Sequence, residues 1–275
     1  MKFTKILLIA VLTIIPPSLF SEIIVQSSMD WSTGHFELYA TRALDSGMSP
    51  SDHPQALKAL ERELPPYVMK ELGLLAWNRG GTLQQGMDKN PSLRTYIESI
   101  ADAIDMEWSR LSKDQKSVEA SYSLELENIL PEIIPPTGVE ELSEKPIGWV
   151  PVPEDSWTGI LIYVPENLPV RGTGLSADIH PALYARVLSD NLEVLADPSI
   201  GNRQLLSYRN IQDRDKTESL IGRRPYRVMA RELYGDLPCD IIISKEDTRR
   251  ILAADSGRHA LSEGRIAILI ESKSE

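Results

Sequence analysis

Residues 118–126 read VEASYSLEL, and apolar and polar side chains alternate along this stretch without a break. Alternation with a period of two places successive side chains on opposite faces of a β-strand. Val118, Ala120 and Tyr122 therefore share one face, while Glu119 and Ser121 share the other. This pattern predicts a half-buried strand, in which the apolar face packs on a core.

A similar alternation lies upstream in residues 35–41, HFELYAT, and a helix start follows it. Ser49 precedes Pro50, and Asp52 comes three residues after Ser49, which is the pattern of an N-cap, a proline in the first turn and an acid near the positive helix end. Apolar residues then recur at spacings of three and four from position 57 to 75. Because Pro65 and Pro66 interrupt this stripe, we expect two helical pieces that meet at a bend.

The next segment, residues 73–86, contains four glycines and is predicted to be a connection. Asn90 and Pro91 repeat the cap and proline signal. Leu93, Ile97, Ile100, Ile104 and Trp108 follow at helical spacing and predict a second amphipathic helix that runs as far as Trp108. The first half of the chain is therefore expected to be a β-α-α-β module.

Six prolines between Pro131 and Pro153 predict an extended linker, because proline disfavours regular helix and sheet. Beyond it, apolar and alternating runs predict strands at residues 160–164, 182–188, 192–195, 204–208, 226–233, 239–243 and 265–271, and Ser244 predicts the start of a short helix. The predicted fold class is α+β, with an N-terminal β-α-α-β module at residues 22–130, a linker at 131–153 and a β-rich module with a short helix at 154–275.

The first 21 residues are typical of a signal peptide. Lys2 and Lys5 precede an apolar run at residues 6–15, which is shorter than the roughly twenty residues that span a bilayer. We expect cleavage after Ser21 and a periplasmic protein with no transmembrane span after cleavage; retention of the segment as an anchor is the alternative. The only cysteine is Cys239, so a lipid cannot be attached to a cysteine near the N-terminus.

The charge of the chain argues against nucleic acid as a partner. Lys and Arg number 29 against 40 Asp and Glu, which leaves a formal net charge of -11. A protein that binds phosphate backbones needs the opposite sign. The composition, with 42% hydrophobic and 25% charged residues, is that of an ordinary globular chain.

The sequence contains no recognisable catalytic, cofactor-binding or metal-binding pattern. The four histidines are scattered, and no G-x-S-x-G motif precedes a helix. Cys239 precedes a run of isoleucines and is expected to be buried. Arg223, Arg224 and Arg227 form a local basic cluster, for which we weigh two interpretations: a solvated surface, or a contact site for an anionic partner.

Several short motifs resemble the superfamily that joins flagellar assembly protein T with the twenty-kilodalton outer-membrane lipoproteins. They are the strand and helix of residues 34–72 with ATRA at 40–43, Trp157-Thr158-Gly159 before an apolar strand, PAL at 181–183, and CDIIIS at 239–244 before a helix. Many members keep Asp-Ala-Arg-Gly where this chain has YVPE at 163–166. The resemblance implies a periplasmic assembly protein and supplies no catalytic residue.

Together these features predict an exported, non-catalytic cell-envelope protein that needs no cofactor and acts through contacts with other envelope proteins, with flagellar proteins among the candidates. Arg223, Arg224 and Arg227 are the predicted partner-binding residues. Two alternatives remain. One is a secreted hydrolase with an unrecognised site. The other is a periplasmic solute-binding or glycan-binding protein, for which the candidate platforms are Trp77, Trp108, Trp149 and Trp157.

Overall fold

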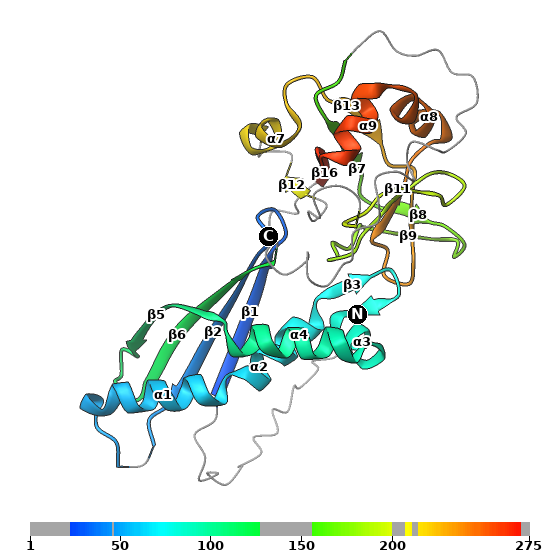
Figure 1. The fold of residues 1–275 in the computed structure, drawn as a ribbon. Helices are drawn as coiled ribbons and strands as arrows, with labels where there is room; N and C mark the ends of the chain where they lie inside the picture. Colours follow the sequence, from blue (N-terminus) through cyan, green and yellow to red (C-terminus); the bar gives the residue numbers. More distant parts are fainter. Residues whose placement is uncertain (1–22, 46, 127–155, 200–206, 211–213, 271–275) are drawn as a thin grey trace, which may run out of the picture.

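The computed structural model describes residues 23–45, 47–126, 156–199, 207–210 and 214–270, which form two mixed modules (Figure 1). The predicted α+β class is confirmed. The predicted signal segment at 1–21 and the predicted linker at 131–153 lie outside the described residues.

The first module is built on a four-stranded antiparallel sheet. Its strands are β1 (Ile23–Asp30), β2 (His35–Ala43), β5 (Asp105–Leu111) and β6 (Ser117–Glu125), in the order β1-β2-β6-β5. Phe36, Leu38 and Ala40 of β2 lie on the same face as Val118 and Ala120 of β6, and all five are buried. The alternation in the sequence thus places the core on one side of this sheet.

Helices cover that side of the sheet. They are α1 (His53–Glu63), α2 (Pro65–Leu74), α3 (Leu83–Lys89) and α4 (Pro91–Asp102), with a short 3-10 turn at Pro50–Asp52 before α1. The Ser49 backbone N–H donates to the Asp52 carboxylate at 2.8 Å, as its position at a helix start predicts. The expected division into two helical pieces is confirmed, since α1 ends just before Leu64 and α2 begins at Pro65.

Three details of the first module differ from the prediction. The second amphipathic helix ends at Asp102, and Trp108 lies in β5 with 40% of its surface exposed. The strand pairing of β5 with β6 overrides the helical spacing there. Strand β1 was not predicted, because its outer residues are polar, and the glycine-rich segment at 73–86 contains a β-hairpin and the first turn of α3.

The second module contains two sheets. The six-stranded sheet has the order β11-β10-β15-β14-β8-β9, and the four-stranded sheet has the order β12-β16-β7-β13. The strands are β7 (Ile160–Val164), β8 (Leu168–Val170), β9 (Leu175–Ala177), β10 (Val187–Leu188), β11 (Val194–Ala196), β12 (Ser207–Asn210), β13 (Tyr226–Met229), β14 (Glu232–Tyr234), β15 (Asp240–Ile242) and β16 (Ile266–Ile270).

The described helices of this module are α7 (Arg214–Ile221), α8 (Lys245–Ala253) and α9 (Asp255–Ser262). The predicted helix start at Ser244 is confirmed, because the Ser244 hydroxyl accepts the Asp247 backbone N–H at 3.0 Å. Neither α7 nor α9 was predicted from the sequence. Both are single short helices whose stability comes mainly from packing, so the sequence pattern is weak.

The two modules contact each other through a hairpin. We call residues 76–82 the junction hairpin; it consists of β3 (Ala76–Asn78) and β4 (Gly81–Thr82) and leaves the first module between α2 and α3. The backbone N–H groups of Leu183, Tyr184 and Leu237 donate to carbonyls of the hairpin at 2.9, 2.7 and 3.0 Å. The modules are therefore joined by backbone hydrogen bonds as well as by side chains.

Candidate functional site

Two of the three predicted arginines line a pocket of about 400 Å³ in the second module, which we call the arginine pocket. Arg223 and Arg227 contribute to its wall, and Arg214 of α7 joins them. Leu161 of β7, Leu269 of β16 and Ile221 of α7 supply apolar lining. The pocket lining thus combines apolar residues with three arginines.

The alternation of β13 explains why Arg227 reaches this pocket. Tyr226 and Arg227 are neighbours in a strand, so their side chains lie on opposite faces of the sheet. The Tyr226 hydroxyl donates to Asp247 of α8 at 2.8 Å, which places α8 on the face away from Arg227. Figure 1 shows α7 and the α8 and α9 pair on opposite sides of β7 and β16. The arginine pocket therefore lies on the α7 face of this sheet.

A close crossing of two chain segments holds the arginine turn in place. The Thr158 hydroxyl donates to the Ile221 carbonyl at 2.7 Å and accepts the Arg224 backbone N–H at 3.1 Å. A Cβ on Gly222 would lie 2.5 Å from Thr158, so the two segments approach too closely for any larger residue at 222. Trp157 packs on Tyr226 with ring centroids 4.3 Å apart. The motif Trp157-Thr158-Gly159 thus positions the turn that carries Arg223.

The three predicted arginines do not all line the arginine pocket. The Arg224 backbone N–H donates to the Thr158 hydroxyl, and Arg224 is not among the residues that line the pocket, so its predicted role in partner binding stays a prediction. Sequence reasoning missed Arg214, which donates to Glu218 at 2.9 Å one helical turn later. The i, i+4 spacing of Thr217 and Ile221, followed by Gly222, was the available signal for α7.

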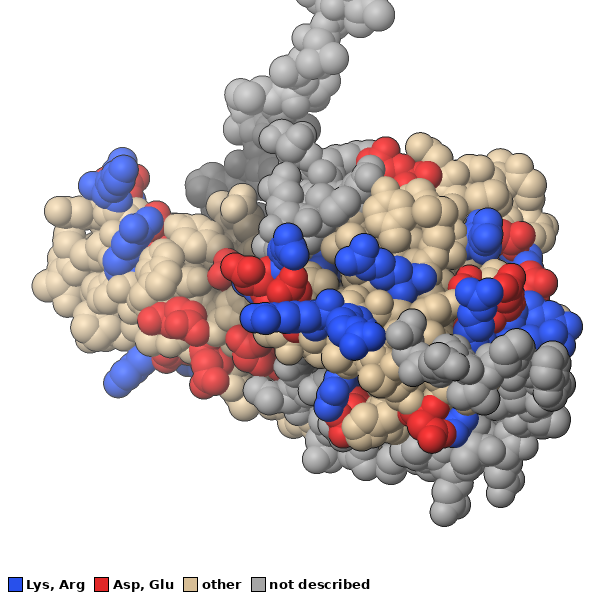
Figure 2. Space-filling view, turned by 90° about the horizontal axis from the view of Figure 1, so that it is seen from above, with Lys and Arg blue, Asp and Glu red and all other residues tan. Residues whose placement is uncertain are grey.

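Basic and acidic side chains are intermingled over the surface that Figure 2 shows, with several Lys and Arg side chains gathered near its middle. Arg223 and Arg227 are exposed, and neither forms an ion pair with another described residue. In a chain with a net charge of -11, this leaves two guanidinium groups available to a ligand.

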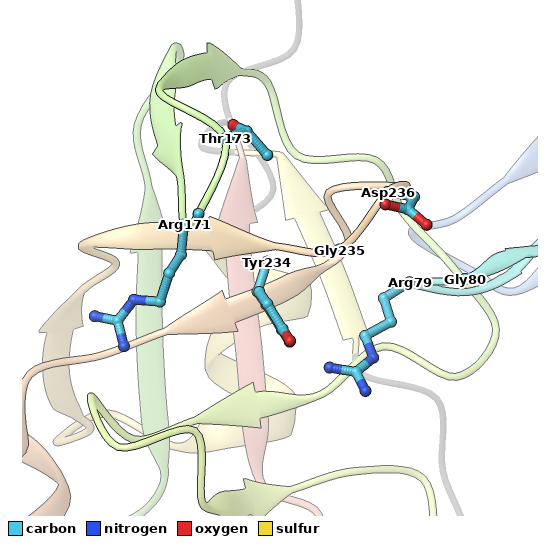
Figure 3. Close-up of a pocket in the computed structure, with 8 residues that line it drawn as sticks. Arg79, Gly80, Arg171, Thr173, Tyr234, Gly235 and Asp236 are labelled. Atoms are coloured by element: carbon cyan, nitrogen blue, oxygen red, sulfur yellow. The ribbon is translucent and has the colours of Figure 1, made fainter.

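A second hollow of about 330 Å³, which we call the junction pocket, lies where the junction hairpin meets the second module (Figure 3). The guanidinium carbon of Arg79 lies 4.7 Å from the centre of the Tyr234 ring. Arg171, on the other side of Tyr234, is paired with Glu232 and Asp190. Asp236 adds a carboxylate to the lining, so the charges of this pocket are nearly balanced.

The tryptophans do not form a shared platform within the described residues. Trp77 stacks on Tyr184 and Trp157 packs on Tyr226. Trp108 contacts Tyr39 at 5.9 Å between ring centroids and lies under Arg110 at 4.9 Å. The prediction that Trp108 lies on the apolar stripe of a helix is wrong, because Trp108 belongs to β5. Trp149 lies outside the described residues. Trp77, Trp108 and Trp157 thus each pack on a different tyrosine, at different places in the fold.

Cys239 and His35 occupy different environments in the part of the chain that the structure describes. Cys239 is buried as predicted, and burial raises the pKa of its thiol to about 12. His35 lies 2.8 Å from Glu125, and this hydrogen bond raises the pKa of the imidazole. No described group of three His, Cys, Asp or Glu side chains is placed to hold a metal ion. None of the described helices is long and apolar enough to cross a membrane.

Comparison with known proteins assigns each module to a family of domains. The model of the N-terminal domain of Treponema pallidum Tp0624 matches residues 22–132, and that of its second domain matches residues 159–272. The resemblance to the flagellar assembly protein T superfamily is therefore wrong. The motifs that carried this resemblance were short strand and turn patterns, such as Trp157-Thr158-Gly159, which serve local packing. No curated protein matches the chain.

Proposed function

The chain belongs to the Tp0624 family, carrying the N-terminal and second domains in that order, and on this framework we propose that it is a non-catalytic binding protein of the cell envelope. The observation that carries the proposal is the arginine pocket. Arg223 and Arg227 lie there beside apolar side chains on the α7 face of a sheet, outside the hydrophobic core. Such a pocket suits a partner with complementary charge.

Export to the periplasm belongs to the same proposal and rests on the sequence of residues 1–21. N-terminal sequencing of the protein from a cell-envelope fraction should find Glu22 as the first residue. A protein that retains Met1 contradicts cleavage and favours a membrane anchor instead.

The binding role is tested with the double variant Arg223→Glu/Arg227→Glu in the full chain. Crosslinking in intact cells, followed by capture of the tagged protein, should retain less partner with this variant than with the wild type. Arg249→Glu is the matched control, because Arg249 is an exposed arginine of the same module on α8, across the sheet from the pocket. Surface substitutions usually change stability by less than about 0.5 kcal/mol, so both variants should fold.

Equal partner recovery with the wild type and the double variant contradicts the arginine pocket as the contact site. Turnover of an envelope substrate by the purified protein contradicts the non-catalytic role, provided that one substitution abolishes turnover and leaves the fold intact. The net charge of -11 supports a protein partner over nucleic acid, because phosphate backbones are bound by positive surfaces.

A further inference from the structure

Resting on the proposed function, we propose that the arginine pocket recognises a peptide segment of its partner in which one aliphatic side chain is flanked by carboxylates. The aliphatic side chain enters the pocket, and the carboxylates pair with the guanidinium groups of Arg223 and Arg227.

The apolar part of the pocket sets the first requirement. Leu161 and Leu269 come from adjacent strands, β7 and β16, and Ile221 of α7 lies with them in the lining. All three are at least partly withdrawn from water, and the volume of about 400 Å³ is at the small end of ligand pockets. An aliphatic side chain fits such a space, and its transfer out of water is favourable. A charged side chain in the same space would lose its hydration, which is unfavourable.

The charges around the pocket set the second requirement. Guanidinium groups match carboxylates in geometry, because both are planar and two parallel hydrogen bonds form between them. Arg214 is already paired with Glu218, so Arg223 and Arg227 carry the recognition. The chain is acidic as a whole, and its net charge of -11 disfavours the same peptide on most of the remaining surface.

A carboxylate suits this pocket better than a phosphate group. Glu218 is also a lining residue, but its ion pair with Arg214 occupies both charges. A phosphate group carries nearly twice the charge of a carboxylate at neutral pH and loses more hydration beside the apolar side chains. The apolar lining therefore favours singly charged side chains.

The experiment uses the full chain and fluorescein-labelled peptides in an anisotropy titration. The test peptide carries Glu-Leu-Glu at its centre within a Gly-Ser sequence. Three matched peptides replace that centre with Lys-Leu-Lys, with Glu-Ser-Glu, or with leucine between two phosphoserines. We expect the Glu-Leu-Glu peptide to bind most tightly, because it alone satisfies both requirements.

Two variants of the pocket should shift this affinity in opposite directions. Arg227→Gln should weaken Glu-Leu-Glu binding by about threefold to fivefold, as the loss of one exposed ion pair does. Glu218→Gln should strengthen it by freeing the guanidinium group of Arg214 from its ion pair. Arg249→Gln, on the other side of the sheet, should leave the affinity unchanged. Circular dichroism of each variant confirms that the fold is intact.

Equal binding of Glu-Leu-Glu and Glu-Ser-Glu peptides overturns the aliphatic requirement, and tighter binding of the phosphoserine peptide overturns the carboxylate requirement. Absence of binding by every peptide also overturns this inference. The proposed function survives each of these results if the Arg223→Glu/Arg227→Glu variant still loses its partner in cells, so the two failures are distinguishable.

Discussion

Replacing Gly235 by alanine should loosen the junction between the two modules. Gly235 has φ +115°, and a Cβ added to it would lie 2.3 Å from the Arg79 Cβ, 2.8 Å from the Leu237 carbonyl oxygen and 3.0 Å from the Arg79 Cα. These are backbone atoms or atoms next to the backbone, so rotation of a flexible side chain does not relieve the overlap. The junction hairpin must move away from the second module.

The expected loss of stability follows from the contacts that the substitution would break. The Leu237 backbone N–H donates to the Arg79 carbonyl at 3.0 Å, and such a hydrogen bond is worth about 1 kcal/mol. The Arg79 guanidinium lies over the Tyr234 ring, which contributes about 0.5–1 kcal/mol. A left-handed backbone costs a non-glycine residue about 1–2 kcal/mol in addition. We expect Gly235→Ala to lower the free energy of unfolding by about 3 kcal/mol.

Gly172→Ala is the matched control. Gly172 also has a left-handed backbone, with φ +85°, but nothing lies within 4 Å of an added Cβ. This variant carries the backbone cost without the collision. Urea unfolding, followed by tryptophan fluorescence, should therefore find Gly235→Ala less stable than Gly172→Ala by about 2 kcal/mol. A difference below about 0.5 kcal/mol would refute the reasoning, since the hairpin would then contribute little to stability.

Three further predictions concern other parts of the molecule. His35→Gln should destabilise the protein at about pH 5.5 but much less at about pH 8. The reason is that the hydrogen bond to Glu125 raises the pKa of His35 in the folded state. The stability from its charged form is therefore fully present below the ordinary pKa of histidine and is lost as pH rises through the folded-state pKa. If His35→Gln lowers the urea midpoint equally at both pH values, this prediction is wrong. Cys239, with its pKa raised to about 12, should resist a thiol reagent until urea unfolds the chain, and rapid labelling of the native protein contradicts its burial. Limited proteolysis should cut first within residues 131–153. The two fragments should still elute together on gel filtration, because the junction hairpin bonds the modules to each other. Separate elution of the fragments contradicts a stable junction.

The sequence was most informative where one local pattern sufficed. Residues 118–126 alternate strictly, and all but the last of them lie in β6 (Ser117–Glu125). The paired prolines at 65 and 66 mark the division between α1 and α2. Cys239 was expected to be buried and has no exposed surface. In each case the signal lies within a few consecutive residues, so no knowledge of distant contacts is needed.

Patterns failed where pairing or packing overrode them. Trp108 continues a helical spacing but lies in β5, because hydrogen bonds to β6 outweigh the weak helical preference of that stretch. The glycines at 80 and 81 suggested a loop, whereas the segment pairs with itself and then bonds to residues 183, 184 and 237 far along the chain. These partners are invisible to a local pattern.

The candidate site divides in the same way. The sequence by itself determined the basic cluster, because Arg223 and Arg227 are close in the chain. Only the tertiary structure decided that Arg214 joins them, that Arg224 does not line the pocket, and that Leu161 and Leu269 lie beside them. The physical reason is the parallel pairing of β7 with both β13 and β16, since parallel neighbours need long crossover connections and bring together residues that are distant in the sequence.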